Sequence, residues 1–304
     1  MQYINGYYII CIPRLKTIGR MYYSSNLTSW NYVEFNFASD DDYAEEAVVS
    51  YANGYWFISW GCPDEDGSSY KPSSYLFYSS SIGGTYSKVT INTSSTNCFT
   101  WGATVGYLNG KYIVVKNYRH DGKYFNGNGT SGIFYGTSPS TINTFKESQS
   151  GIDLHSNDYL CTRVRVINNE CIFYNGRKVM IVDQNLNIRE ISLSNNSASW
   201  HNAGVIFNNN SFIIVDNSPA FEKYMGTNLT TATKTYDVSY NNFGENGNFG
   251  FSLDVVNESE GKIVVLSNGA GNSSFFQKEY TIVHSTALPT MTHEKVYTYI
   301  KIKE

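Results

Sequence analysis

The sequence predicts an all-β fold, and within that class a six-bladed β-propeller of four-stranded antiparallel blades. Three observations lead to this prediction. Two strand-like runs meet at an Asn- or Gly-rich turn six times along the 304 residues. Each of these hairpins is followed by a second segment of strand, small polar turn and strand. The copies recur every roughly 40–60 residues, which suits propeller blades with unequal loops and exceeds leucine-rich or tetratricopeptide periods.

The first half of each repeat is a hairpin whose turn has a physical cause. Asn-Gly is the favoured pair in a two-residue type I′ turn, because both central residues take positive φ. The flanking runs are rich in Val, Ile, Tyr, Phe and Trp, which are typical strand residues. The three later copies match the pattern more loosely. The six predicted turns are Asn5-Gly6, Asn53-Gly54, Asn109-Gly110, Asn168-Asn169, Asn208–Asn210 and Glu260-Gly261.

The second half of each repeat adds two more strands. An apolar run leads into a small polar turn, such as Ser24–Asn26, and a further strand-like run follows. Because one sheet cannot bury both faces alone, the units must pack on one another, and a closed ring also protects their edges. We therefore expect a single domain over residues 1–304, with blades at about 1–37, 44–91, 98–148, 159–193, 199–240 and 248–304.

The repeats resemble the propellers with sialidase-like or Kelch-like blades, along nearly the whole chain. The Asp-box of sialidase-like blades is Ser-x-Asp-x-Gly-x-x-Trp, at the turn between the third and fourth strands. Here Ser24–Trp30 (SSNLTSW) stands at that place, but it lacks the Asp and the Gly and is one residue short. The richness in Tyr, Asn and Ser is also similar to propeller modules of bacteriophage tail and receptor-binding proteins.

Composition narrows the range of partners. Charged and aromatic residues each make up 16% of the chain, and Tyr alone occurs 26 times. Tyr suits binding surfaces, because one end of its side chain is apolar and the other forms hydrogen bonds. The net charge of −4 comes without a basic stripe, so nucleic acid is not an expected partner. We expect neither a signal peptide nor a membrane-inserted segment, which leaves virion, cell-surface and cytoplasmic locations open.

The predicted binding face lies opposite the stereotyped hairpin turns. In a propeller the first strand of each blade lines the central channel, and variable loops on a rigid scaffold commonly carry binding residues. One strand length before each turn, the sequence places carboxylates, two Trp, an Arg and a His, a set that suits a sugar. With the loop positions added, the ligand-binding candidates are Glu46, Trp60, Trp101, Arg119, His120, Arg163, Trp200 and His201.

Several of these candidates also have a structural interpretation. Trp101 and Trp200 could lie in the core between blades, since large aromatic side chains are commonly buried. Arg163 and Arg165 alternate with valines, so both side chains share one face of their strand. At the channel they would need carboxylate partners, and Glu46 or Asp254 could form structural ion pairs with them.

A calcium site is the weaker interpretation of the loop Cys62–Gly67. Its alternate carboxylates, Asp64 and Asp66, precede a Gly, as in part of a calcium-binding loop. The loop lacks a third ligand position and a terminal Glu. The sequence therefore favours a solvated acidic turn and no cofactor, with calcium as the alternative.

For function, the main prediction is a non-catalytic propeller that recognises a surface glycan or a protein receptor. It would belong to a phage-tail or adhesin assembly, formed through the rim or an upstream segment. The chain has no Gly-x-Ser-x-Gly, His-Glu-x-x-His or phosphate-loop motif, which favours a non-enzyme. The alternative is a glycoside hydrolase or sialidase-like hydrolase, and a purely structural ring is a second alternative. A glycosidase needs two carboxylates roughly 5–10 Å apart, and the candidates are Glu45, Glu46, Asp216 and Asp254.

Overall fold

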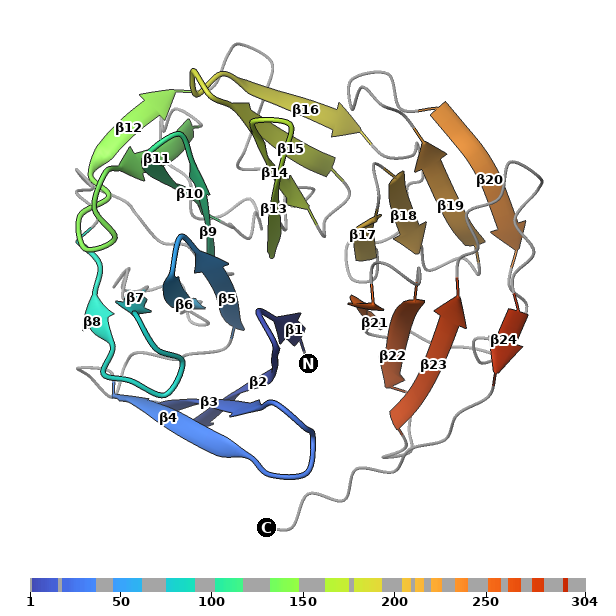
Figure 1. Ribbon diagram of the computed structural model, residues 1–304, viewed down its shortest axis with the longest axis horizontal. Coiled ribbons are helices and arrows are strands. Elements are labelled where there is room, and N and C mark those ends of the chain that lie inside the picture. Colours follow the sequence, from blue (N-terminus) through green and yellow to red (C-terminus); the bar gives the residue numbers. More distant parts are fainter. Residues whose placement is uncertain are drawn as a thin grey trace, which may run out of the picture. The chain divides into compact units, whose positions relative to one another are not determined.

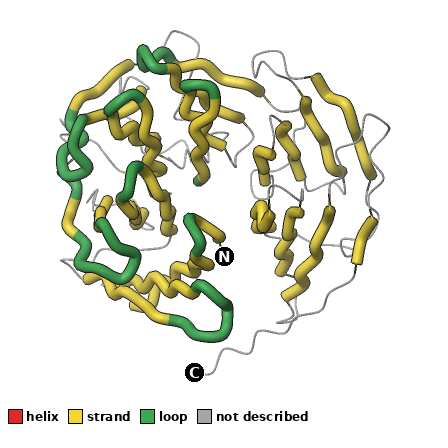
Figure 2. The backbone as a smooth tube through the Cα atoms, viewed as in Figure 1, coloured by secondary structure: helices red, strands yellow, loops and turns green. Residues whose placement is uncertain are grey.

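A computed structural model gives the arrangement of the chain (Figure 1). It describes the following residues: 2–15, 18–36, 46–61, 75–90, 102–116, 132–147, 162–174, 178–192, 204–208, 211–215, 220–225, 233–239, 251–257, 262–268, 275–281 and 292–294. Within these ranges every regular element is a strand, and turns join the strands (Figure 2). The chain divides into two compact units, Met1–Ser192 and Leu193–Glu304.

The first unit holds four sheets, and each sheet takes four consecutive strands in chain order. Neighbouring strands are antiparallel throughout. The strands are β1 (Gln2–Ile4), β2 (Tyr7–Leu15), β3 (Ile18–Ser24) and β4 (Asn31–Asn36); β5 (Glu46–Ala52), β6 (Tyr55–Gly61), β7 (Tyr75–Ser79) and β8 (Ser87–Lys88); β9 (Ala103–Leu108), β10 (Lys111–Lys116), β11 (Gly132–Gly136) and β12 (Thr144–Glu147); and β13 (Arg163–Ile167), β14 (Glu170–Tyr174), β15 (Lys178–Asp183) and β16 (Ile188–Ser192).

The second unit repeats this pattern in two further sheets, again with four consecutive antiparallel strands each. Its first strands, β17 and β21, contact each other. The strands are β17 (Gly204–Asn208), β18 (Ser211–Val215), β19 (Ala220–Met225) and β20 (Thr233–Ser239), then β21 (Phe251–Asn257), β22 (Lys262–Asn268), β23 (Phe275–Thr281) and β24 (Thr292–Glu294). The all-β class and the four-stranded antiparallel sheets of the prediction are thus confirmed.

The turns between first and second strands have the backbone that the sequence predicts. Asn53 and Gly54 have φ of 46° and 83°, and the turns at Asn5 and Asn109 are nearly identical. Both central residues therefore lie in the left-handed region that a type I′ turn requires. The turn Asn168-Asn169 achieves the same conformation without Gly, with φ of 50° and 60°, because Asn tolerates this region better than other side chains do.

The turns between third and fourth strands share a side-chain cap in all four sheets of the first unit. A residue at or just after the end of the third strand accepts hydrogen bonds from backbone N–H groups two or more positions later. The acceptors are the hydroxyls of Ser24, Ser79 and Ser138 and the carboxylate of Asp183. Such local bonds favour a turn over continued strand.

Aromatic side chains close two of these turns. Trp30 Nε1 donates to the carbonyl of Leu27 at 3.2 Å, and the Tyr86 hydroxyl donates to the carbonyl of Ile82 at the same distance. Asn26 Oδ1 accepts from the N–H groups of Thr28 and Ser29, both at 3.0 Å. Asn26 and Trp30 therefore fill the places of the Asp and the Trp in the degenerate Asp-box.

Three apolar cores hold the first unit together, one between each pair of neighbouring sheets. The first joins Ile9 and Met21 to Ile58 and Trp60. The second joins the β6 and β10 side chains around Phe57, and the third joins the last two sheets. Each fully buried large side chain contributes about 1.5–3 kcal/mol, so the packing of sheet on sheet is the main source of stability.

Candidate functional site

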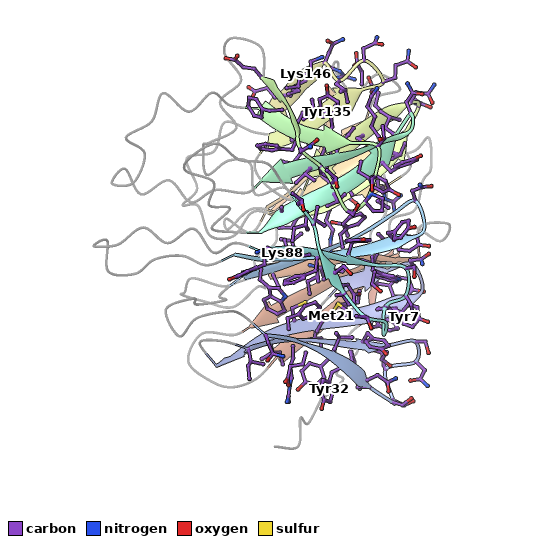
Figure 3. The ribbon with its side chains drawn as sticks, turned by 90° about the vertical axis from the view of Figure 1, so that its left-hand side faces the viewer. Tyr7, Met21, Tyr32, Lys88, Tyr135 and Lys146 are labelled. Carbon is purple, nitrogen blue, oxygen red and sulfur yellow. The ribbon has the colours of Figure 1, made fainter. Side chains whose placement is uncertain are left out.

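The first strands of the second, third and fourth sheets lie next to one another in the first unit (Figure 1). All three run in the same direction, from their first residues to the hairpin turns at Asn53, Asn109 and Asn168. We call their first residues, Glu46, Ala103 and Arg163, the inner-strand starts. Figure 3 shows Tyr7, beside a hairpin turn, on one side of the unit, and Lys88, at the end of β8, on the opposite side. The inner-strand starts lie at the opposite ends of these strands from the hairpin turns.

Two buried serines join the second sheet to β9. The fully buried Ser59 hydroxyl accepts a hydrogen bond from Ala103 N at 2.6 Å and lies 3.0 Å from the Ala103 carbonyl oxygen. The Ser50 hydroxyl accepts from Val105 N at 3.1 Å. Because Ser59 also pairs with Val48 in the sheet, Ala103 lies level with Val48 of β5. Hydrogen bonds between sheets thus fix the start of β9 against the start of β5.

Gly102 adds a close packing contact to this junction between the second sheet and the start of β9, which we call the joint. Its φ is +80°, and a Cβ there would lie 2.8 Å from both Ser59 Oγ and Val48 Cγ2. Only Gly fits, because the conformation is left-handed and the space is already filled. Sequence reasoning missed Ser59 and Gly102. The available signal was a lone hydroxyl inside the apolar run of β6, together with a Gly directly before a strand.

The candidate carboxylates are divided between the two units. Glu46 is the first residue of β5 and pairs with Gly61. Asp254 lies within β21, where it pairs with Val264. For both residues the structure describes the backbone alone, and Glu45 and Asp216 lie outside the described residues. The strands β5 and β13 begin at Glu46 and Arg163, whereas β9 and β17 begin at Ala103 and Gly204, after the predicted entry positions Trp101 and Trp200.

Arg163 and Arg165 share one face of β13, as their alternation with valines predicted. Arg163 pairs with Tyr174 and Arg165 with Ile172, and both arginines are half-buried. The intervening Val164 packs toward the third sheet, where its Cγ2 lies 3.0 Å from the position of a Cβ on Gly106. The two guanidinium groups are therefore on the face of β13 that points away from the third sheet.

Trp60 is a core residue, and its assignment to the ligand surface needs correction. Its side chain is fully buried within β6, with its ring centroid 5.8 Å from that of Phe35. A Cβ on Gly19 would lie 2.8 Å from the indole ring, so β3 packs directly against it. A ring enclosed in this way has no face left for a ligand. Because β6 extends to Gly61, Trp60 lies within the strand and not in the following loop, where the sequence analysis placed it.

The other predicted site residues lie outside the described residues. They are Trp101, Arg119, His120, Trp200 and His201, together with the calcium candidates Asp64 and Asp66. Their assignments stay predictions. In the sequence, Trp101 directly precedes Gly102, the glycine that packs against Ser59 and Val48.

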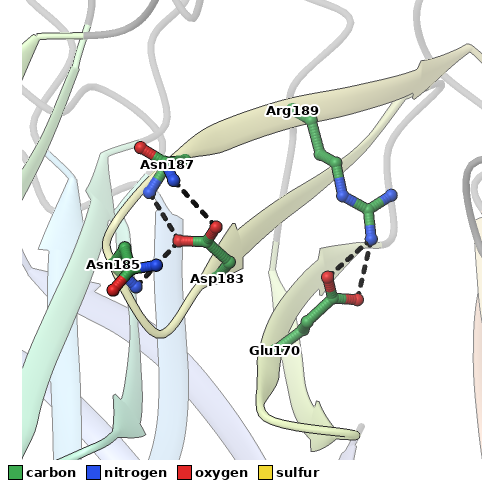
Figure 4. A network of polar contacts seen from close by, with 5 residues as sticks. All are labelled: Glu170, Asp183, Asn185, Asn187 and Arg189. Carbon is green, nitrogen blue, oxygen red and sulfur yellow. Dashed lines mark hydrogen bonds and ion pairs between the residues drawn. The ribbon is translucent and has the colours of Figure 1, made fainter.

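Figure 4 shows charged side chains that stabilise a turn and link two strands in the fourth sheet. Arg189 Nη2 contacts both carboxylate oxygens of Glu170 at 2.7 Å, and both side chains are partly buried. Partial burial raises the pKa of the Asp183 carboxyl, but hydrogen bonds from Asn187 and Asn185 and the charge of Lys146 outweigh it. The net result is a lowered pKa. These interactions have a structural role in the fourth sheet.

Within the described ranges, no group of three or more His, Cys, Asp or Glu side chains could hold a metal ion. In the same part of the chain, no helix has the length and apolarity needed to cross a membrane.

Comparison with known proteins shows similarity at the level of fold. No protein family and no curated protein matches the sequence. Among solved structures, the periplasmic gluconolactonase of Pseudomonas aeruginosa aligns with a TM-score of 0.55 and 10% identity, over 95% of this chain and 83% of that one. A streptogramin B lyase aligns with a TM-score of 0.50 and 14% identity, over 96% and 88%. A GH43 β-1,3-galactosidase aligns with a TM-score of 0.48 and 9% identity, over 98% and 93%.

These neighbours correct the main functional prediction. The gluconolactonase and the lyase are β-propeller-type proteins with enzyme names, whereas the sequence analysis favoured a non-catalytic binding module. That prediction is contradicted, and the enzymatic alternative is better supported. The similarity supports a β-propeller fold for this chain.

Proposed function

We propose that this chain is a propeller hydrolase that acts on carbohydrate, with glycoside hydrolysis as its reaction. The observation that carries the proposal is the position of Glu46 at the start of an inner strand, beside the joint between the second and third sheets. Propeller neighbours with enzyme names support a catalytic role for the chain. The half-buried Arg163 is the first residue of β13, which follows β5 and β9 among the inner strands, and it places a cation at the same end of the strands as Glu46.

The proposal includes one ring of six blades over residues 1–304. Six sheets with the same strand order support it, as do neighbours that align along 95% and 96% of the chain. Sialidase-like blades are supported by the capped turns at Ser24 and Ser79. Membership of a phage-tail or adhesin assembly, a receptor as partner and calcium at Asp64 and Asp66 stay predictions.

Glycoside hydrolysis assigns distinct roles to two carboxyl groups. One protonates the leaving oxygen, and the other acts as nucleophile or activates water, depending on their separation. The sequence candidates for these groups are Glu45, Glu46, Asp216 and Asp254. An arginine near the site would favour sugars that carry a carboxylate, because guanidinium and carboxylate form paired hydrogen bonds.

A second candidate reaction is hydrolysis of a sugar lactone. It is favoured by the alignment with a protein named gluconolactonase, whose TM-score of 0.55 is the highest of the three comparisons given above. The two reactions are separable, since lactone opening releases acid without releasing a sugar from a glycosidic bond.

The test is a turnover screen on neutral glycosides, sialosides, uronides and sugar lactones, each run with calcium and with EDTA. We expect turnover of one class and a loss of about 10²–10⁴-fold in kcat for Glu46→Gln, because general acid–base groups contribute that much. Glu147→Gln is the matched control, since Glu147 is an exposed carboxylate on the outer strand β12. Turnover that persists unchanged in Glu46→Gln would remove this residue from the mechanism, and no turnover of any class would end the proposal.

A further inference from the structure

We propose that Ser59 is a positioning residue for the site at the inner-strand starts. This inference rests on the proposed function and adds a residue that neither touches substrate nor carries charge. Its hydroxyl ties the backbone of Ala103, the first residue of β9, to the neighbouring sheet. Ser59 thereby fixes the position of β9 along β5. It also fixes the position of Gly102, which directly precedes β9, relative to the start of β5 at Glu46.

The hydrogen-bond arrangement at this point is specific. The Ala103 N–H donates to Ser59 Oγ at 2.6 Å, and the hydroxyl proton has two acceptors, the Ala103 carbonyl at 3.0 Å and the Val48 carbonyl at 3.4 Å. Ala103 is 1% exposed and Ser59 is fully buried. Water therefore cannot replace the hydroxyl, and its removal leaves a buried N–H without this acceptor.

Sequence position connects this joint to the proposed chemistry. Val48, whose carbonyl faces Ser59, is two residues after Glu46 in β5. Ala103 is two residues after Trp101, the predicted sugar-stacking residue, and Gly102 between them is held at φ +80° against Ser59 and Val48. The proposed catalytic carboxylate and the predicted binding aromatic thus each precede, by two residues in the sequence, a residue whose backbone contacts the Ser59 hydroxyl.

Ser50 provides a matched control within the same interface. Ser50 is 4% exposed, and its hydroxyl accepts from Val105 N at 3.1 Å, so it joins β5 of the same sheet to β9. Val105 is two residues further from the start of β9. Ser50→Ala therefore removes a comparable buried hydrogen bond between sheets without releasing the first residue of the strand.

The experiment combines amide hydrogen exchange with kinetics on the substrate found by the screen. In Ser59→Ala we expect exchange in the peptide over Gly102–Val105 to speed up about tenfold, and KM to rise about five- to tenfold with kcat within about twofold. In Ser50→Ala the KM should stay at the wild-type value. A general loss of stability would act on both variants alike, so the difference in KM isolates positioning.

Each outcome of this experiment supports or overturns the positioning role of Ser59. Unchanged exchange in Ser59→Ala would show that Ser59 does not hold the start of β9, and would overturn the inference. Faster exchange with a KM equal to that of Ser50→Ala would also overturn it, because the joint would then be structural only. If the wild type turns over no substrate, the proposed function fails with the positioning role, whereas the exchange data still report on the joint itself.

Discussion

At the scale of single residues, two glycines in the same backbone region have different reasons to be Gly. Gly54 ends a hairpin turn at φ +83° and has open space around the position of a Cβ. Gly102 has φ +80°, but a Cβ there would meet Ser59 and Val48 at 2.8 Å. Conformation alone therefore demands Gly at the first position, while conformation and packing together demand it at the second.

This difference predicts unequal costs for the same substitution. Gly54→Ala should lower the free energy of unfolding by about 1–2 kcal/mol, the strain of an L-residue in the left-handed region. Gly102→Ala should cost that amount and a further 1–3 kcal/mol or so from overpacking. Urea unfolding of both variants measures the two values. Equal losses would mean that the second and third sheets adjust freely at the joint.

Trp60 shows why residue-level assignments from sequence can fail. A large aromatic at the end of a strand run can point to solvent or into a core, and the choice depends on which sheet covers it. Here Gly19 of β3 allows close approach, so the ring is enclosed. That information lies about 40 residues away in the chain and in a different sheet, beyond the reach of a local pattern.

At the scale of elements, the sequence predicted what depends on local chemistry. The Asn-Gly turns and the strand alternation of Arg163 and Arg165 were found as expected, because φ preference and side-chain alternation are properties of short segments. The sequence analysis recognised only one of the capped turns, Ser24–Trp30, as similar to an Asp-box. Ser79–Tyr86 has the full spacing of an Asp-box, with Ser at the Asp place and Tyr at the Trp place, and its hydrogen bonds reveal the likeness.

The turn at Asp183 predicts a pH dependence. The folded-state pKa of Asp183 is below its ordinary value of 3.8, so the ionised turn adds stability above that pH. This contribution is lost as the pH falls through the folded-state pKa. The free energy of unfolding of Asp183→Asn should therefore differ most from the wild type at pH 7, and the difference should shrink below about pH 3.8. Urea titrations at pH 7 and pH 3 test this, and a difference that is constant with pH would contradict it.

At the scale of the whole molecule, repeated hairpins were enough to predict an all-β chain of four-stranded sheets, since each repeat needs neighbours to bury its faces. Function was not accessible in the same way. In the sequence, Trp101 falls between β8 and β9 and the pair Arg119 and His120 between β10 and β11, where no periodic pattern constrains them. The preference for a binding module rested on missing motifs, and two carboxylates on separate strands leave no motif to find.

The proposed mechanism assigns an acid–base role to the carboxylate of Glu46, the first residue of β5. A general acid–base group acts in the transition state, so its removal lowers kcat, whereas removal of an exposed carboxylate elsewhere does not. The difference in kcat between these two changes is therefore the central claim in measurable form.

The most direct measurement is kcat for the wild type, Glu46→Gln and the control Glu147→Gln, on the substrate identified by the screen. The account predicts that Glu46→Gln loses about 10²–10⁴-fold, and that Glu147→Gln keeps the wild-type value, because Glu147 is an exposed carboxylate on β12. Wild-type kcat in Glu46→Gln, or an equal loss in Glu147→Gln, would contradict it.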